Sequence, residues 1–531
     1  MSDKPNAIVM INDSPSSLVF IRICIVALQC IGPCSLAWTV WLALNVIINK
    51  KAIGSLHLPG LQAYVVAEAV FYLFFLWFRR HLQREAVHPP LSTREERQAL
   101  AQKVRGEIHD PDRFLSGWFR GADPEDIGRD DLRSFLNWCF WEGRATKADA
   151  EEMESYVNLV EDITGHQFQE SKGGAHALRL TLDPIEMDAR SLLWYGIVML
   201  MDHVTSARFW YSGFSYRRTG FIGPWTFPPR PGTLFAGGRS PAKSLSYWVR
   251  PHTSKTRLPV LFIHGIGIGL DPYVELLSGI NASNPADESV GVLVLEILPI
   301  SSRITHPILR REAFIQQITQ ILDLHGYDKF VLASHSYGSV FSTYMLTDDD
   351  LTSRISATIL IDPVTILLHM PDVAFNFTVR KPRTANEWQL WYFASKDPGV
   401  AHTLGRHFFW FENCLWRQRI NQLVQGGMRI TVSLASRDLI VDTKAVARYL
   451  FNEEVPDPDL IDLHGHQHME LETQHQEDGL EPWENRTWRG KGLDLLWNVD
   501  LDHAQVFDDA PARAKLVRII NEYSQPCEDG A

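Results

Sequence analysis

The chain has few cysteines, no excess of positive charge and no Gly-Lys-Ser/Thr phosphate loop. Its formal net charge is −12 over 531 residues, which argues against a nucleic-acid partner. The six cysteines are scattered singly, apart from three in an apolar N-terminal stretch, so the sequence indicates neither a disulfide framework nor a zinc knuckle. Reduced thiols fit a chain whose bulk faces the cytosol. The length leaves room for a large core and more than one unit.

Two long apolar runs near the N-terminus predict a membrane anchor over residues 1–81. We expect transmembrane segments at about 18–48 and 59–78, because each run is long enough to span a bilayer with tilt. One span plus an interfacial helix is the alternative. The arginines that follow the second run outweigh the two lysines that follow the first, which favours a cytosolic position for the bulk of the chain. We expect the membrane to be an endomembrane such as the ER. Glu68 interrupts the second run, and we expect it to be protonated or bonded to a neighbouring helix.

Residues 82–222 show helical periodicity and carry no motif with obvious chemistry. We interpret them as a helical connecting region. Helical stretches are predicted after Ser92-Thr93, at 130–141 and at 148–163. Residues 191–201 are again apolar, but Asp202 and His203 end this run early, so it predicts a buried or membrane-surface helix rather than a third span.

From residue 223 to 531 the pattern changes to short β-rich runs that alternate with helical stretches. This pattern predicts the α/β class, a mostly parallel sheet with helices on both faces. Strands are predicted at 245–250, 258–263, 290–298, 330–333, 357–361, 428–434 and 493–499. The carboxyl ends of such strands share one edge of the sheet, where sites form in open α/β folds.

The segment Phe330 to Ser339 contains a small-x-Ser-x-Gly pattern directly after a strand. This pattern is typical of a sharp strand-to-helix turn that holds Ser336 at its apex as a nucleophile. Ser334 and Gly338 supply the small side chains that the crowded turn needs, with Ser334 in place of the usual glycine. The alternative is an ordinary buried strand with a serine-rich end.

A glycine-rich loop, His264-Gly265-Ile266-Gly267, follows an earlier strand. Its amide at Ile266 and the amide of Tyr337 can form an oxyanion hole for a carbonyl under attack. A phosphate-binding loop is the rival interpretation, but the spacing fits neither a Walker loop nor a dinucleotide fingerprint.

A serine nucleophile needs a base, and the base needs an acid to orient it. Asp438 follows the strand at 428–434, and His503 follows the strand at 493–499. We therefore predict a triad of Ser336, His503 as base and Asp438 as acid. Asp362 follows the strand at 357–361 and is the alternative acid.

These motifs make the chain, from about residue 240 to its end, resemble the α/β-hydrolase superfamily. The anchor and helical preface also resemble a group of largely uncharacterised fungal membrane-anchored α/β-hydrolases. The resemblance implies an α/β-hydrolase fold with Ser336 as nucleophile, Asp438 as acid and His503 as base, and with Ile266 and Tyr337 as oxyanion donors. Weaker candidates for contact with the substrate are His264, Gly265, Gly267 and His335. A loop-ordering role is more typical for a residue such as His264.

Two segments within the predicted hydrolase domain depart from its alternating pattern. Residues of about 364–425 are aromatic-rich and occupy the usual place of a cap, either as packing between cap helices or as an apolar lid that admits an acyl chain. A polar insertion at about 452–490 contains His464, His466, His468 and His475. No acidic cluster or cysteine pair is spaced to complete a site with them, so we predict no metal and no cofactor.

These features together predict a membrane-anchored serine hydrolase that cleaves hydrophobic or lipid-derived carboxylic esters through an acyl-enzyme. The expected partners are that ester and the lipid bilayer. An acyltransferase is the alternative among enzymes, because an alcohol or amine can resolve an acyl-enzyme. A catalytically silent membrane scaffold or receptor with the same fold is the alternative from another class.

Overall fold

The computed structural model describes residues 13–49, 59–171, 173–220, 226–282, 288–451, 483 and 486–525. Lys50 and Lys51, which entered the orientation argument, lie outside the described residues. The four histidines of the polar insertion, His464, His466, His468 and His475, lie outside them as well.

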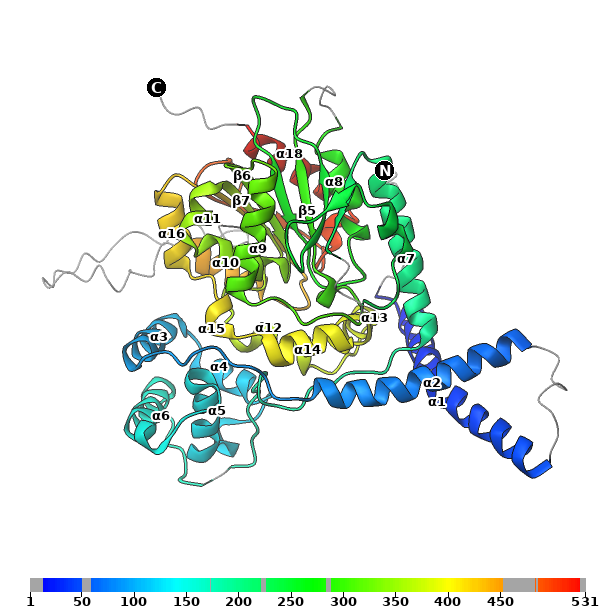
Figure 1. The fold of residues 1–531 in the computed structure, drawn as a ribbon. Coiled ribbons are helices and arrows are strands. Elements are labelled where there is room, and N and C mark those ends of the chain that lie inside the picture. The colour runs from blue at the N-terminus through cyan, green and yellow to red at the C-terminus, as the bar shows by residue number, and fades with distance from the viewer. Residues whose placement is uncertain are drawn as a thin grey trace, which may run out of the picture.

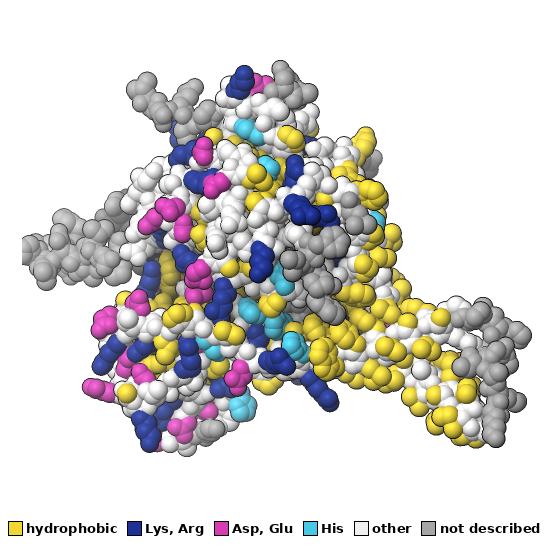
Figure 2. All heavy atoms as spheres, viewed as in Figure 1, with side chains coloured by type: hydrophobic (Ala, Val, Ile, Leu, Met, Phe, Trp, Pro, Cys, Tyr) yellow, Lys and Arg dark blue, Asp and Glu magenta, His cyan; other side chains and the backbone are white. Residues whose placement is uncertain are grey.

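Two helices near the N-terminus are long and apolar enough to cross a membrane, judged by length and composition. They are α1 (Pro15–Asn49) and α2 (Pro59–Leu82); in Figure 1 the end of α1 and the start of α2 extend away from the rest of the chain, while their other ends lie against the cap and α7. Both helices include the runs predicted from the sequence. Figure 2 shows hydrophobic side chains gathered over these two helices and beside them.

Glu68 of α2 is almost fully buried and bonds to another helix, as the sequence led us to expect. Its carboxylate accepts the N–H of Leu192 at 2.9 Å and the hydroxyl of Tyr64 at 3.0 Å. Leu192 begins helix α7 (Leu192–Tyr211), whose first amides lack partners within the helix. Glu68 thus ties the second apolar helix to α7.

The helical region between the two apolar helices and the sheet contains α3 (Arg94–Glu107), α4 (Pro111–Trp118), α5 (Arg129–Trp141) and α6 (Ala150–Thr164). Helix α3 begins with a capping box of Thr93 and Glu96, which satisfies amides at its start. Helix α6 ends at Gly165, whose φ of +69° suits a glycine. Large aromatic side chains from α4 and α5 fill the core of this region.

The apolar run at 191–201 forms the first half of helix α7, which is not one of the two helices long and apolar enough to span a membrane, and the helix itself continues past Asp202 and His203 to Tyr211. Within the helix, the carboxylate of Asp202 forms ion pairs with Arg303 and Arg230. The helix stops only before Gly213, which has a φ of +81°. One side of α7 is apolar and exposed, at Leu193, Ile197, Leu200 and Val204.

A nine-stranded sheet forms the centre of the molecule, in the order β2-β1-β3-β5-β4-β6-β7-β8-β9. Strands β4 to β9 pair in parallel, and β3 runs antiparallel to its neighbours β1 and β5. The strands are β1 (Ser215–Arg218), β2 (Gly238–Arg239), β3 (Ser246–Arg250), β4 (Val260–Ile263), β5 (Val292–Glu296), β6 (Phe330–His335), β7 (Ile355–Ile361), β8 (Arg429–Ala435) and β9 (Leu493–Asn498). The predicted mostly parallel α/β sheet is confirmed, with β1 and β2 as unpredicted edge strands. Strand β1 lies before residue 223, where the sequence predicts the hydrolase domain to begin.

Helices cover both faces of the sheet (Figure 1). One face packs against α9 (Arg311–Leu324), α10 (Gly338–Leu346) and α17 (Thr443–Phe451), with α11 (Asp349–Arg354) beside α10. The other face packs against α8 (Val274–Gly279), α18 (Ala510–Tyr523) and the end of α7. Burial on both faces explains why the central strands are continuous apolar runs rather than alternating ones.

The segment predicted as a cap is helical and lies between the sheet and the helical region (Figure 1). It contains α12 (Pro371–Thr378), α13 (Ala385–Gln389), a π-helical turn at Leu390–Ser395, α14 (Pro398–His407), α15 (Trp410–Asn413) and α16 (Arg417–Gln425). Tyr392 and Ala385 pack with Ile21 and Ile25 of α1. The cap therefore contacts the first apolar helix directly.

Candidate active site

Ser336 occupies a sharp turn between strand β6 and helix α10, as the small-x-Ser-x-Gly pattern predicts. Its φ is +50°, a left-handed conformation that is uncommon for a residue with a side chain. The space around the turn is tight, because a Cβ at Gly338 would lie 2.4 Å from the carbonyl oxygen of Ile263. The amide of Ser336 donates to the carbonyl of Ile361 at 2.9 Å, which fixes the turn against strand β7.

The structure brings Ser336, Asp438 and His503 together at the carboxyl edge of the sheet. His503 Nε2 lies 2.8 Å from Ser336 Oγ, and His503 Nδ1 lies 2.7 Å from Asp438 Oδ2. With the proton on Nδ1 donated to the carboxylate, Nε2 is free to accept the serine proton. This arrangement can withdraw a proton from Ser336 as its oxygen attacks a carbonyl.

The electrostatics around His503 favour its protonated form. Burial alone would lower the pKa of His503, but the carboxylates of Asp438, Asp362 and Asp502 outweigh burial and raise that pKa to about 9. Asp438 contributes most of this rise, through its charge and its hydrogen bond. The imidazolium that forms when Ser336 loses its proton is therefore stabilised.

The alternative acid, Asp362, is fully buried near His503 but is held by the backbone. Its Oδ1 accepts the N–H of Ala435 and its Oδ2 accepts the N–H of Ala504, each at 3.0 Å. Burial raises the pKa of Asp362 to about 7; the charge of His503 opposes this rise, whereas that of Asp438 adds to it. Asp438 therefore hydrogen-bonds the imidazole of His503, whereas Asp362 links two loops by accepting a backbone amide from each.

The loop that carries Asp438 is itself held in place by hydrogen bonds. Asp438 Oδ1 accepts the amides of Ile440 and Val441 at 2.7 and 2.9 Å. Asp502 Oδ1 accepts the amide of Leu439 at 3.0 Å and that of His503 at 2.7 Å. These contacts fix the direction of the carboxylate, which a base-orienting group needs.

Three groups near the nucleophile have the chemistry of metal ligands. One ligand atom from each of Asp362, Asp438 and His503 lies within 4.8 Å of the others. The two histidine nitrogens already face Asp438 and Ser336, and the Asp362 oxygens already accept backbone amides. The donor set therefore fits proton transfer better than metal binding.

Two backbone amides next to Ser336 are available for an oxyanion. The N–H groups of Ile266 and Tyr337 have no hydrogen-bond acceptor within the part of the chain that the structure describes, whereas those of Gly265 and Gly267 are both bonded. Ile266 and Tyr337 also line the same cavity as Ser336. A Cβ at Gly265 would lie 2.7 Å from that of Ser336, so the loop can approach the nucleophile only with glycine there.

The four weaker candidates for substrate contact, His264, Gly265, Gly267 and His335, are not among the cavity-lining residues. His264 Nδ1 donates to the carbonyl of Gly265 at 2.6 Å, and its Nε2 accepts the amide of Ile297 at 2.9 Å. Burial lowers the pKa of His264 to about 4, so it is a neutral, loop-ordering residue.

His335 lies behind the sharp turn that holds Ser336 rather than in the cavity. It is buried, and its Nδ1 accepts the hydroxyl of Tyr273 at 2.8 Å, while that hydroxyl also accepts the amide of Gly265. Its ring packs edge-on against Phe507. His335 therefore links the glycine loop to the base of the nucleophile turn.

Ser336 opens into an apolar cavity between the sheet and the cap. The cavity has a volume of about 580 Å³, which includes open solvent at its mouth. Ser336 and Thr378 supply the polar side chains, and the remaining lining is apolar or aromatic, including Phe377, Phe408 and Trp410 from the cap. Part of the aromatic cap thus faces the cavity, while Trp388 and Phe393 pack near α1.

Sequence reasoning missed three lining residues from the helical region. Trp118, Trp138 and Leu180 all line the cavity that contains Ser336. The concentration of large aromatic residues between 118 and 141 was the one signal that could have indicated a wall, but no local pattern says which core they join. The connecting region is therefore part of the site.

Residues 259–486 match the family model described as alpha/beta hydrolase fold. This part of the chain has the α/β-hydrolase fold. The match contains Ser336 and Asp438 and ends before His503. A search of curated proteins found no match to this chain.

Solved structures with similarity to the chain include several esterases. A membrane phospholipase A described as a bacterial virulence factor is 10% identical, with 62% of this chain and 94% of that chain covered and a TM-score of 0.35. Carboxylesterase CesB from Bacillus subtilis is 9% identical, covers 61% and 98%, and has a TM-score of 0.34. Carboxyl esterase 2 from the fungus Tuber melanosporum is 13% identical, covers 53% and 81%, and has a TM-score of 0.32. These scores are too low to add to the argument from the family match and the strand order.

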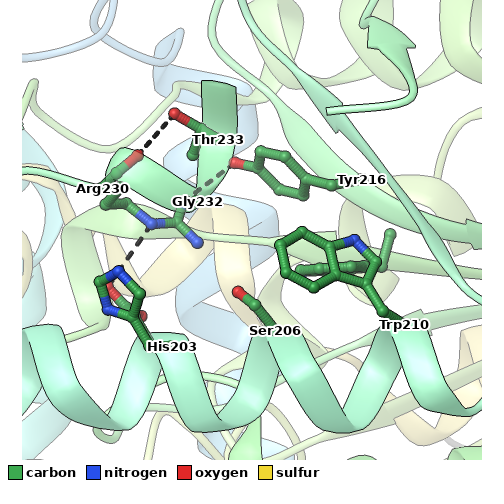
Figure 3. Close-up of a pocket in the computed structure, with 9 residues that line it drawn as sticks. His203, Ser206, Trp210, Tyr216, Arg230, Gly232 and Thr233 are labelled. Atoms are coloured by element: carbon green, nitrogen blue, oxygen red, sulfur yellow. Dashed lines mark hydrogen bonds and ion pairs between the residues drawn. The ribbon is translucent and has the colours of Figure 1, made fainter. Parts of the chain in front are cut away.

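A separate polar pocket lies between α7 and the edge of the hydrolase sheet (Figure 3). Arg230 crosses it, with hydrogen bonds of 2.6 and 2.7 Å to Glu296 and an ion pair of 3.5 Å to Asp202. Tyr216 also donates to Glu296 at 2.8 Å. Burial opposes ionisation, but Arg230 outweighs it and lowers the pKa of Glu296 to about 2. The ion pairs of Arg230 link α7 to the sheet. Among the described residues that line the pocket, no nucleophile is hydrogen-bonded to a base.

Proposed function

We propose that the protein is a serine hydrolase that cleaves lipophilic carboxylic esters from a membrane surface. The observation that carries this proposal is the position of His503, which bonds Ser336 and Asp438 at 2.8 and 2.7 Å at the edge of an apolar cavity. The α/β-hydrolase fold of residues 259–486 agrees with it.

In the proposed reaction, Ser336 Oγ forms a bond to the ester carbonyl carbon while its proton passes to His503 Nε2. The carbonyl oxygen becomes negative and is stabilised by the amides of Ile266 and Tyr337. The ester C–O bond then breaks, and the imidazolium returns its proton to the leaving alkoxide. Water then forms a bond to the acyl carbon while its proton passes to His503 Nε2; the bond from that carbon to Ser336 Oγ breaks, the proton returns to Ser336, and the carboxylic acid is released. Asp438 keeps the imidazole in the correct tautomer throughout.

The preference for a lipophilic ester rests on the apolar cavity and on its surroundings. The cavity is lined by aromatic and aliphatic side chains, and the cap above it packs against α1. Exposed apolar side chains continue from α1 and α2 to α7 (Figure 2). We propose that α1 and α2 span an endomembrane, with the hydrolase domain on the cytosolic side, so that the substrate reaches the site from lipid.

Labelling with a fluorophosphonate probe in detergent or nanodiscs tests the proposal. The wild-type protein should be labelled and should hydrolyse p-nitrophenyl esters, and Ser336→Ala should do neither while keeping its melting temperature. A folded wild-type protein that takes no label would indicate a silent scaffold and contradict the proposal. Labelling together with transfer of the acyl group to an added alcohol in preference to water would indicate an acyltransferase.

A further inference from the structure

A second apolar cavity lies inside the helical region that precedes the sheet. Its volume is about 620 Å³, which includes open solvent at its mouth. Its walls come from α3, α4, α5 and α6, and include Ala101, Val104, Leu136, Leu159 and Val160. Polar groups are few: Arg105 is exposed at one side, and His369 is buried on the side of the cap. We call this space the distal chamber.

The distal chamber and the cavity of Ser336 share a wall. Trp118, Trp138 and Trp410 line both spaces. The first two belong to the helical region, and the third belongs to cap helix α15. All three side chains are at most 8% exposed, so they separate two interior spaces rather than forming the outer surface.

Two of the wall tryptophans are tied by hydrogen bonds and the third is not. Trp118 Nε1 donates to the carbonyl of His369 at 3.2 Å, and Trp138 Nε1 donates to Thr181 Oγ1 at 3.0 Å. Trp410 Nε1 is buried and finds no acceptor among the residues with described positions. Trp410 is thus the wall residue whose indole can move without breaking a hydrogen bond.

Close contacts hold the helical region against the cap, in the arrangement visible in Figure 1. A Cβ at Gly117 of α4 would lie 2.4 Å from Pro371 Cγ at the start of α12. Arg113, on the same helix, forms ion pairs of 2.8 Å with Asp372 and 2.7 Å with Asp442. These contacts hold the helical region, and with it the distal chamber, in a fixed position relative to the cavity that contains Ser336.

We propose that the distal chamber is the far end of the substrate site and takes the terminal part of a long acyl chain. The ester carbonyl lies at Ser336, the first part of the chain fills the cavity under the cap, and the remainder passes Trp410 into the helical region. An apolar space suits a hydrocarbon chain because burial of each additional methylene is favourable. This inference rests on the proposed function and adds the substrate class, esters of long-chain fatty acids.

The test compares ester chain lengths in variants of one helix. Ala101 of α3 lines the distal chamber and is 5% exposed, so Ala101→Phe fills the chamber from its wall. Ala99 lies on the same helix but is exposed and lines an outer groove instead, so Ala99→Phe is the matched control. We measure kcat/KM in nanodiscs for p-nitrophenyl acetate, octanoate and palmitate.

Ala101→Phe should lower kcat/KM for palmitate by about tenfold or more while acetate changes less than about twofold, because only the long chain reaches the blocked space. Ala99→Phe should match the wild type for all three esters. If Ala101→Phe lowers the melting temperature, Ala101→Leu is scored in its place. A palmitate rate that follows the acetate rate in both variants would overturn the inference, as would a wild-type preference for acetate.

Two further outcomes separate this inference from the function on which it rests. If the wild type hydrolyses no ester and takes no fluorophosphonate, the proposed function fails. If it hydrolyses short esters through Ser336 but Ala101→Phe leaves the chain-length profile unchanged, only the distal chamber is refuted.

Discussion

Replacing Asp438 with asparagine should leave the site assembled but reverse the hydrogen bond to the base. The two backbone amides of Ile440 and Val441 face one side-chain oxygen of Asp438, so the asparagine oxygen must take that place. The asparagine NH2 then faces His503 Nδ1 at the position now 2.7 Å away. An imidazole that accepts at Nδ1 carries its proton on Nε2, where it cannot take the proton of Ser336.

The loss in kcat should be on the order of 10³–10⁴-fold, as expected when a triad histidine is held in the wrong tautomer. This corresponds to about 4–5.5 kcal/mol of lost transition-state stabilisation, at 1.36 kcal/mol for each tenfold. Hydrolysis of p-nitrophenyl octanoate and the rate of fluorophosphonate labelling should fall together. The melting temperature should change little, because the asparagine oxygen keeps both backbone hydrogen bonds.

The matched control is Asp362→Asn. The two oxygens of Asp362 accept the amides of Ala435 and Ala504, so asparagine leaves one amide facing an NH2 group. We expect a stability loss of about 1–3 kcal/mol and a change in kcat of less than about tenfold. If Asp362→Asn instead loses about 10³-fold at an unchanged melting temperature while Asp438→Asn keeps a tenth of wild-type turnover or more, the assignment of the acid is wrong.

Three other predictions concern the glycine loop, the pH profile and the buried ion pair of Arg230 with Glu296. Gly265→Ala should lower kcat about 100-fold, because the new Cβ would lie 2.7 Å from the Cβ of Ser336. Gly267→Ala should leave kcat unchanged, because its Cβ would meet no atom within 4 Å, so equal kcat values for the two variants would contradict this prediction. Since the base acts in its neutral form, kcat/KM for an uncharged ester should rise with pH through the raised pKa of His503, about 9, and a plateau already reached at pH 6 would refute the electrostatic argument. Glu296→Gln should cost about 1.5–3 kcal/mol in urea unfolding at pH 7 by leaving Arg230 with only its longer ion pair to Asp202; because the pKa of Glu296 is lowered to about 2, the wild type should lose this advantage between about pH 4.5 and 2, and an unchanged difference at low pH would count against the ion pair.

The sequence by itself determined those parts of the molecule that depend on near neighbours in the chain. The turn at Ser336 follows from a strand, small residues on both sides and a helix, because only such residues fit where strand and helix nearly collide. The start of α3 at Thr93 and Glu96 follows from a capping box in the same way. The buried strands follow from apolar runs that helices cover on both faces.

Local signals were insufficient where a distant partner changes the outcome. Asp202 ends the apolar run in the sequence, but α7 continues past it to Tyr211, and Asp202 pairs there with Arg303 and Arg230, which are distant in the chain. Strands β1 and β2 are short and lie at the sheet edge, where β1 pairs with β3 and β2 pairs with β1, so neither strand needs a long apolar run of its own.

Only the tertiary structure decided which acid contacts His503 and which residues enclose the cavity. Asp438 and Asp362 both follow strands of one sheet, and they differ in whether backbone amides already occupy both carboxylate oxygens. Trp118 meets the carbonyl of His369 across a separation of 251 residues, a contact that no local periodicity encodes. Backbone hydrogen bonding and sterics act between neighbours, whereas a cavity is formed by surfaces that meet only when the whole chain packs.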